Sequence, residues 1–258
     1  AFKQGDILLF KMIRNISQFA SDQEIHDNLK AYAPELIKLC LNKNVNVDMR
    51  IELIGILGNI RLGDEWATHL RNKNFMEFIT GNLMIDANED DLILDTVVLI
   101  STMCENEKCC AIVGNSQICH ILEELLQEKV HDDEFTHQIL YIFYRLLLND
   151  IQTDFIIGQS NIVQYCIEAI GDQNPKIRGI VDDLLTIVME LDVDLAEKIK
   201  MRKFYEHNKE WVESMEQFEK TMSMNYNGGY EYGDENWNDY GNGLDSRMWD
   251  SDSENNYQ

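Results

Sequence analysis

The segment Tyr141-Ile-Phe-Tyr-Arg-Leu146 decides the fold, because the chain repeats its pattern at a steady interval. Four other segments align with it: Lys11–Ile16, Gly55–Ile60, Val98–Met103 and Leu185–Glu190. The five segments begin 43 or 44 residues apart. A repeat of this length is typical of proteins built from stacked pairs or triplets of helices.

The fourth period shows the parts of one repeat. Glu107–Val113 predicts a short helix, and Gly114 follows at a position typical of a helix C-terminus. Gln117–Lys129 carries apolar residues at helical spacing, and Asp132 can cap the helix that comes next. Phe135–Leu148 is apolar nearly all round, as a helix buried between neighbours must be. Three helices per repeat favour the armadillo type over the two-helix HEAT type.

We therefore expect an all-α, right-handed armadillo solenoid of about five repeats, the first of them partial. The repeats occupy residues 1–193. Residues 194–220 predict one long charged helix that caps the last repeat, since a solenoid needs a polar end for solubility. Residues 221–258 form an acidic tail rich in Gly, Tyr and Trp, with no Ile, Val or Phe. Such a tail cannot bury enough apolar surface to offset its ordering entropy, so we expect it to be disordered.

Charge and hydropathy exclude two classes of partner. The net charge of −24 repels phosphate backbones, which argues against nucleic acid. The apolar stretch Leu140–Leu148 is interrupted by Arg145 and is far shorter than the roughly 18 residues of a membrane span, so we expect no direct membrane insertion. No secretory signal is visible. The missing initiator Met and the start within a repeat lead us to expect a fragment or a processed chain.

No catalytic motif is present: the chain has no phosphate-binding glycine loop, no nucleophile elbow and no H-E-x-x-H zinc motif. We expect neither enzymatic activity nor a cofactor. The one metal-like cluster lacks the C-x-x-C spacing of structural zinc sites, so we interpret its cysteines as buried helix residues of a reduced, cytosolic protein. It consists of Cys104, Cys109, Cys110, Cys119 and His120.

The candidate binding surface is one face of the third helices, which line the concave side of an armadillo solenoid. Glu52, Asp95, Gln138 and Asp182 recur at one position of these helices, 43 or 44 residues apart. This polar ladder has two interpretations. Its members are either solvated edge positions or the floor of a groove that selects a basic partner.

Further candidates lie on the same face, and all are proposed as protein-binding residues. Asn15 and Asn59 resemble the asparagine ladder that holds extended peptides in importin-α. The pattern breaks at Thr102, Arg145 and Met189, which argues against a nuclear-import receptor. Tyr141 completes the set of candidates.

Several spaced runs are similar to the kinesin-associated protein family, the non-motor accessory subunits of heterotrimeric kinesin-II. The runs are Ile13–Ser17, Glu89–Leu94, Asp132–Tyr144 and Ala196–Glu213. The resemblance covers about residues 10–213, and the family carries further repeats before this point.

The resemblance implies an adaptor that binds the motor-subunit tails of kinesin-II and links the motor to cargo adaptor proteins. It implies microtubule-based transport, including intraflagellar transport, and a location in the cytoplasm, on the microtubule cytoskeleton and in the cilium. An unrelated armadillo scaffold, axonemal or similar to nuclear-import proteins, stays open as the alternative.

Overall fold

The computed structural model describes residues 4–18 and 23–227. Within these ranges the chain forms fourteen α-helices and two short 3-10 helices, and no strand. The expectation of an all-α fold is therefore confirmed. The chain divides into two compact units, residues 1–209 and 210–258, which we describe separately.

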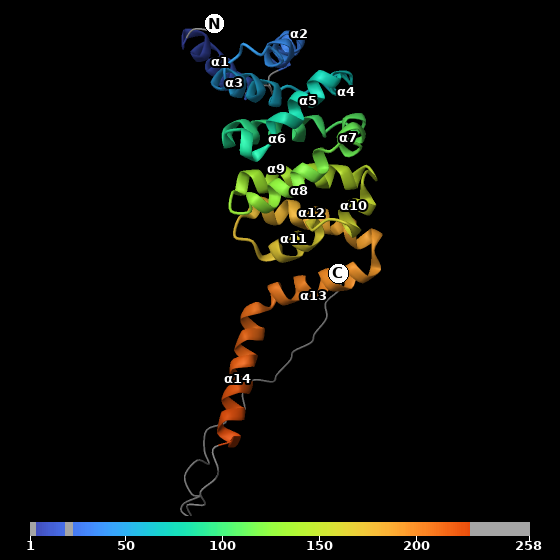
Figure 1. The fold of residues 1–258 in the computed structure, drawn as a ribbon. Helices are drawn as coiled ribbons and strands as arrows, with labels where there is room; N and C mark the ends of the chain where they lie inside the picture. Colours follow the sequence, from blue (N-terminus) through green and yellow to red (C-terminus); the bar gives the residue numbers. More distant parts are fainter. Residues whose placement is uncertain (1–3, 19–22, 228–258) are drawn as a thin grey trace, which may run out of the picture. The chain divides into compact units, whose positions relative to one another are not determined.

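The long helices of the first unit stack on one another in chain order (Figure 1). We call them the third helices: α1 (Gln4–Ser17), α3 (Val47–Gly58), α6 (Asp90–Met103), α9 (Asp133–Leu148) and α12 (Pro175–Leu191). Each packs against the next, and their first residues lie 42 or 43 positions apart. The repeat period read from the sequence is thus the spacing of the layers.

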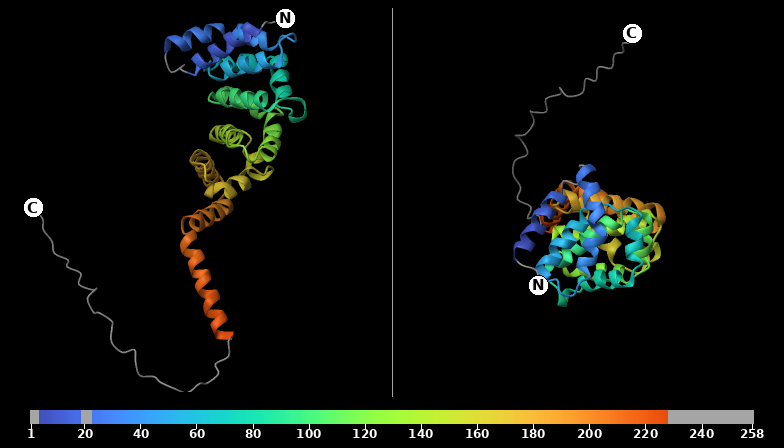
Figure 2. Two further views of the ribbon diagram at one scale, coloured as in Figure 1. Left: turned by 90° about the vertical axis from the view of Figure 1, so that its left-hand side faces the viewer. Right: turned by 90° about the horizontal axis from the view of Figure 1, so that it is seen from above.

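Shorter helices precede α6, α9 and α12 and complete these layers, which Figure 2 shows from the side. Three full repeats have the expected order, with first helices α4 (Glu65–Leu70), α7 (Glu107–Gly114) and α10 (Thr153–Gly158), second helices α5 (Lys73–Asn82), α8 (Ile118–Glu128) and α11 (Ile162–Glu168), and 3-10 turns η1 (Ile85–Ala87) and η2 (Ala169–Gly171).

The repeat before α3 departs from this order, because one continuous helix, α2 (Gln23–Cys40), replaces the separate first and second helices. Asn28 stands in α2 at the position that Gly114 holds at the end of α7, yet the helix continues through it. Pro34 lies inside α2 and cannot donate a backbone hydrogen bond, yet the helix continues past it.

Capping side chains fix where α3 and α9 begin. Asn46 accepts a hydrogen bond from the backbone N–H of Met49 at 3.1 Å, and Asp132 accepts two, from Glu134 and Phe135, at 3.0 and 3.2 Å. Asp132 therefore caps α9 as its sequence predicts.

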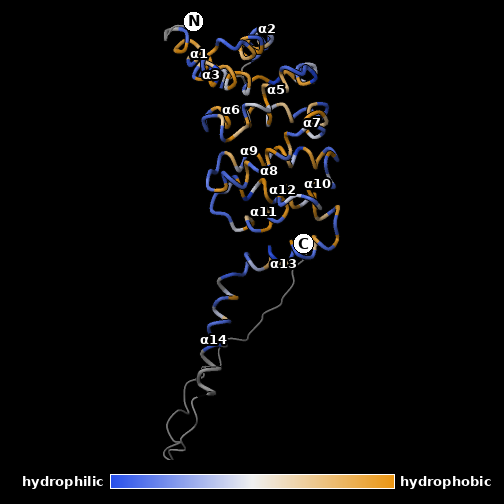
Figure 3. Tube along the Cα trace, viewed as in Figure 1, coloured by the Kyte–Doolittle hydropathy of each residue, from blue (hydrophilic) through white to orange (hydrophobic). Residues whose placement is uncertain are grey.

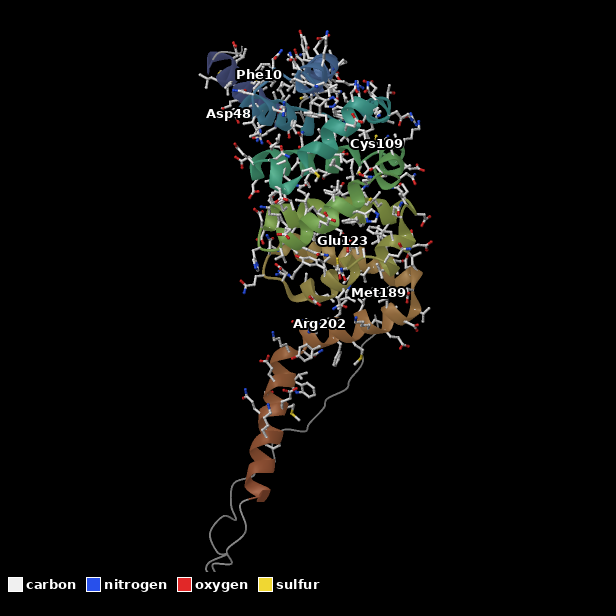
Figure 4. The ribbon with its side chains drawn as sticks, in the orientation of Figure 1. Phe10, Asp48, Cys109, Glu123, Met189 and Arg202 are labelled. Atoms are coloured by element: carbon white, nitrogen blue, oxygen red, sulfur yellow. The ribbon has the colours of Figure 1, made fainter. Side chains whose placement is uncertain are left out.

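The core of the first unit is one continuous apolar cluster. Figure 3 shows hydrophobic residues recurring along the helices of the stacked layers. Side chains fill the space between successive helices (Figure 4). In α3 the residues Leu53, Ile54, Ile56 and Leu57 have no exposed surface. Such all-round burial is what the apolar third helices require, since neighbours cover them on several sides.

Gly114 has a different role from the one expected. The sequence places Gly114 just after the helix, where glycine often takes a positive φ, but among the described glycines only Gly63 has one. Gly114 is the last residue of α7, and a Cβ added there would lie 2.3 Å from Cγ2 of Ile151. Glycine is needed at this position because α7 and the chain after α9 approach closely.

The segment expected as one capping helix is divided at Asn208. The helix α13 (Val193–His207) packs on α12 and buries Ala196 and Ile199. The Asn208 side-chain amide donates to the carbonyl of Phe204 at 2.7 Å, and such a local bond competes with helix continuation.

In the second unit, α14 (Lys209–Asn227) continues seven residues past the expected end of that helix. Trp211, Met215 and Phe218 lie on one of its faces and are exposed. The rest of the predicted acidic tail, residues 228–258, lies outside the described residues. No described helix is long and apolar enough to span a bilayer.

Candidate functional site

A cavity of about 380 Å³ lies across α3, α6 and α9, beside the ends of α1 and α2. Its lining residues are Ser17, Gln18, His26, Gly58, Asn59, Arg61, Val98, Thr102, Glu105 and Gln138. We call the surface that these residues line the groove. Three of the predicted site residues, Asn59, Thr102 and Gln138, meet in it.

Asn59 and Thr102 occupy equivalent positions in successive repeats, and each donates to the preceding third helix. The Asn59 amide Nδ2 donates to the Ser17 hydroxyl at 2.8 Å. The Thr102 hydroxyl donates to the backbone carbonyl of Gly58 at 2.6 Å. These donors therefore stabilise the stacking of repeats, whereas the Asn59 carboxamide oxygen keeps its capacity to accept.

Arg145 holds the equivalent position in the next repeat and follows the same rule. Its Nε donates to the carbonyl of Cys104 at 3.1 Å, and its Nη2 donates to that of Glu105 at 2.7 Å. At this break in the predicted asparagine ladder an arginine therefore replaces the asparagine, but a hydrogen bond to the preceding repeat is still made.

Glu52 and Asp95 lie next to the groove and are nearly buried, with 7% and 9% of their surface exposed. Arg14 of α1 reaches both: its Nη2 lies 2.6 Å from Oδ1 of Asp95, and its Nη1 lies 3.8 Å from Oε2 of Glu52. Lys11 approaches Glu52 at 3.8 Å. Two members of the polar ladder are therefore paired within the chain.

The environment of Asp95 is unfavourable to its charge. Burial raises the pKa of Asp95 from its ordinary value of 3.8 to about 6, although the charge and hydrogen bond of Arg14 lower it. Its Oδ2 atom is buried and has no hydrogen-bond partner among the described residues.

The remaining candidates are more dispersed. Gln138 donates to Glu134 of its own helix at 3.0 Å, and Tyr141 packs at an angle against the Tyr144 ring, 6.2 Å away. Burial raises the pKa of Tyr141. Asn15 is exposed on α1. Asp182 is exposed, pairs with Lys203 of α13 and lines a different cavity.

Arg14, the residue that joins the two buried carboxylates, is not among the site residues predicted from the sequence. A signal for it exists in the aligned segments. Gly55 stands where the other repeats have Val98, Tyr141 and Leu185, and a missing side chain at one repeat position indicates that another group crosses there. A Cβ on Gly55 would lie 2.4 Å from Nε of Arg14.

A second cavity, of about 540 Å³, lies between α1 and α2 and has different chemistry. Its lining is mainly apolar and includes Phe10, Ile13, Leu29 and Leu36. It offers few polar groups, so the groove is the surface suited to a polar chain.

The cysteines of the predicted cluster are buried and unpaired in disulfides. The Cys110 thiol donates to the carbonyl of Cys104 at 2.9 Å, and burial raises the pKa of Cys119 to about 12. These residues pack as small apolar side chains, as the sequence interpretation has it.

The model of the family described as kinesin-associated protein (KAP) matches residues 1–250. The chain belongs to this family. The resemblance read from the spaced sequence runs is thereby confirmed, and the alternative of an unrelated armadillo scaffold is set aside.

Two solved structures show what fold this kinesin-associated protein shares. A designed armadillo repeat protein in complex with a (KR)4 peptide has a TM-score of 0.58 and 15% identity, over 76% of this chain and 82% of that one. An engineered protein has a TM-score of 0.55 and 13% identity, over 76% of this chain and 89% of that one. The armadillo type of the solenoid is confirmed by this likeness.

Proposed function

We propose that this kinesin-associated protein is a non-enzymatic adaptor that binds motor-subunit tails of kinesin-II in its groove and links the motor to cargo adaptor proteins. Family membership supports a kinesin as the partner. In this proposal the protein works in microtubule-based transport, including intraflagellar transport, and is located in the cytoplasm, on microtubules and in the cilium.

The observation that carries the binding mode is the groove itself. Asn59, Thr102 and Gln138 line it with amide and hydroxyl groups from three successive repeats. Groups of this kind can bond to the backbone of an extended segment, because a peptide carries a donor and an acceptor at nearly every residue.

The charge of the protein favours a basic segment. The net charge is −24, and complementary charge steers association and raises its rate. The designed armadillo protein of the same fold was solved with a (KR)4 peptide, which is wholly basic. We therefore expect the bound part of a motor tail to be rich in Lys and Arg.

Size-exclusion chromatography of the full chain with separately purified motor domains and tails of kinesin-II tests the proposal. The tail should co-elute with the chain, and the motor domain should not. The variant Glu52→Gln, Asp95→Asn, Asp182→Asn should bind the tail more weakly and with a shallower salt dependence, since it removes three ladder charges.

The matched control is Glu124→Gln, Asp154→Asn, Asp183→Asn, which removes the same charge from exposed positions on α8, α10 and α12. It should bind nearly as the natural chain does. Equal loss in both variants would mean that only net charge matters and that the groove is not the site. A tail that never co-elutes would refute the adaptor function.

A further inference from the structure

We propose that Glu52 and Asp95 form a subsite for an arginine side chain of the partner, and that Arg14 occupies this subsite until the partner displaces it. The inference rests on the proposed function, since it names a chemical group that the basic partner inserts. Arg14 then acts as an internal stand-in for the ligand.

The geometry of Asp95 shows that Arg14 fills the subsite incompletely. A guanidinium can donate two parallel hydrogen bonds to one carboxylate. Arg14 donates to Oδ1 of Asp95 at 2.6 Å, whereas Oδ2 is buried with no partner among the described side chains and backbone groups. The approach of Arg14 to Glu52 is 3.8 Å, too long for a hydrogen bond. Two buried carboxylates therefore share one well-formed bond.

The position of Asp95 places the subsite within reach of a chain in the groove. Asp95, Val98 and Thr102 follow one another at i, i+3 and i+7, so they share a face of α6. Val98 and Thr102 line the groove. Asp95 lies one helical turn before Val98, about 5 Å along the helix axis.

Arg14 can leave the subsite without disturbing the helices. Its side chain is 28% exposed, and it crosses α3 at Gly55, which presents no side chain to hold it there. Two guanidinium groups at one carboxylate would repel each other, so a partner arginine enters only as Arg14 moves out.

The experiment measures binding of a fluorescently labelled (KR)4 peptide to the full chain by fluorescence polarisation. Arg14→Gln should bind about fivefold more tightly, because the competing guanidinium is gone and both oxygens of Asp95 are left without a partner. Asp95→Asn should bind about fivefold more weakly. The double variant should bind no more tightly than Asp95→Asn alone. Asp183→Asn, an exposed acidic control on α12, should differ little from the natural chain.

Arg14→Gln leaves the buried carboxylate of Asp95 without a partner and can lower stability, so each variant is first checked by its circular-dichroism melting curve. Arg14→Lys serves where Arg14→Gln does not fold, since it keeps the positive charge and loses the guanidinium fork. It should also tighten peptide binding, by a smaller factor.

A direct readout is the side-chain Nε–H signal of Arg14 in nitrogen-15 NMR spectra. Saturating peptide should shift or remove this signal, while that of Arg178, which donates to the carbonyls of Asp172 and Gln173, stays in place. An unmoved Arg14 signal at saturation, or an Arg14→Gln variant that binds equally or more weakly, would overturn the inference.

The outcomes separate this inference from the proposed function. If kinesin-II tails bind the natural chain and all variants equally, the adaptor function stands and the arginine subsite fails. If the peptide results are as expected but no motor tail binds, the subsite stands and the proposed partner is wrong.

Discussion

Arg14 and Asp95 lie 81 residues apart in the chain and are joined at 2.6 Å, although their helices α1 and α6 have α3 between them. The bond exists because Gly55 leaves the surface of α3 open at the crossing point. A glycine in the middle of a buried helix, which helix propensity disfavours, is thereby explained.

Replacing Gly55 with alanine should break this bond. The new Cβ would lie 2.4 Å from Nε of Arg14, so the side chain must move away from Asp95. Loss of the bond should outweigh the gain in helix propensity and lower the free energy of unfolding by about 1 to 2 kcal/mol. Urea denaturation followed by circular dichroism measures it.

Gly58→Ala is the matched control, one turn along the same helix. Its new Cβ would meet Cγ1 of Val98 at 3.5 Å, an ordinary contact. This variant should be neutral or more stable by about 0.5 to 1 kcal/mol. If Gly55→Ala were as stable as Gly58→Ala, the Arg14–Asp95 bond would contribute nothing.

Asp95 should make the protein more stable as the pH falls from 7 towards 4. Its pKa is about 6 in the folded chain and near 3.8 in the unfolded one, so the folded state binds the proton more tightly. Protonation of Asp95 should therefore raise the free energy of unfolding by roughly 2 to 3 kcal/mol. This contribution is fully present below about pH 4 and is lost as the pH rises through 6.

The measurement compares the free energy of unfolding of the natural chain with that of Asp95→Asn at pH 7 and pH 4.5. The other carboxylates are common to both proteins, so their titration largely cancels in the difference. Acidification should raise the free energy of unfolding of the natural chain relative to that of Asp95→Asn. A relative loss would mean that the ion pair with Arg14 outweighs burial.

Asp132→Ala should lower the free energy of unfolding by about 1 kcal/mol, because it removes the two capping bonds at the start of α9. Glu89 holds the same position before α6 but makes no side-chain capping bond. Thermal or urea unfolding of Glu89→Ala should show a change within about 0.5 kcal/mol. Similar losses in both would refute a specific role for the cap.

Native thiols should react slowly with a disulfide reagent at pH 8. All six cysteines are buried, so the reagent has little access to any thiol. Burial also raises the pKa of Cys40 and Cys166 to about 12, so these two form almost no reactive thiolate. The absorbance of the released thiolate should rise only as urea unfolds the chain. If the native protein rapidly released one molar equivalent of reagent thiolate, one of its cysteine thiols would be accessible.

The sequence predicts the layers well because their cause is local. Asp132 and the apolar run that follows it determine the start and the burial of α9 through spacing alone. The continuous helix α2 is not predictable in this way: Asn72 and Gly114 lie at the junction of the first and second helices of later repeats, but Asn28 at the equivalent position does not interrupt α2.

The site is less predictable, because its bonds depend on the stacking distance between repeats. The position of Glu52 and Asp95 on one face follows from the period, but their pairing with Arg14 does not. Asn59 and Arg145 likewise look like free groove residues in the sequence, yet each donates to the preceding repeat.

The bond between Arg14 and Asp95 also bears on how such a chain can change in evolution. In a solenoid held by nearest-neighbour contacts, one repeat can be duplicated, deleted or exchanged at the cost of two interfaces. A side chain that spans an intervening helix removes this freedom locally, because any substitute for α3 must offer a glycine under the guanidinium. We expect α1, α3 and α6 to be inherited together as one unit. A shortened version of the protein should therefore keep these three helices and lack repeats that follow them.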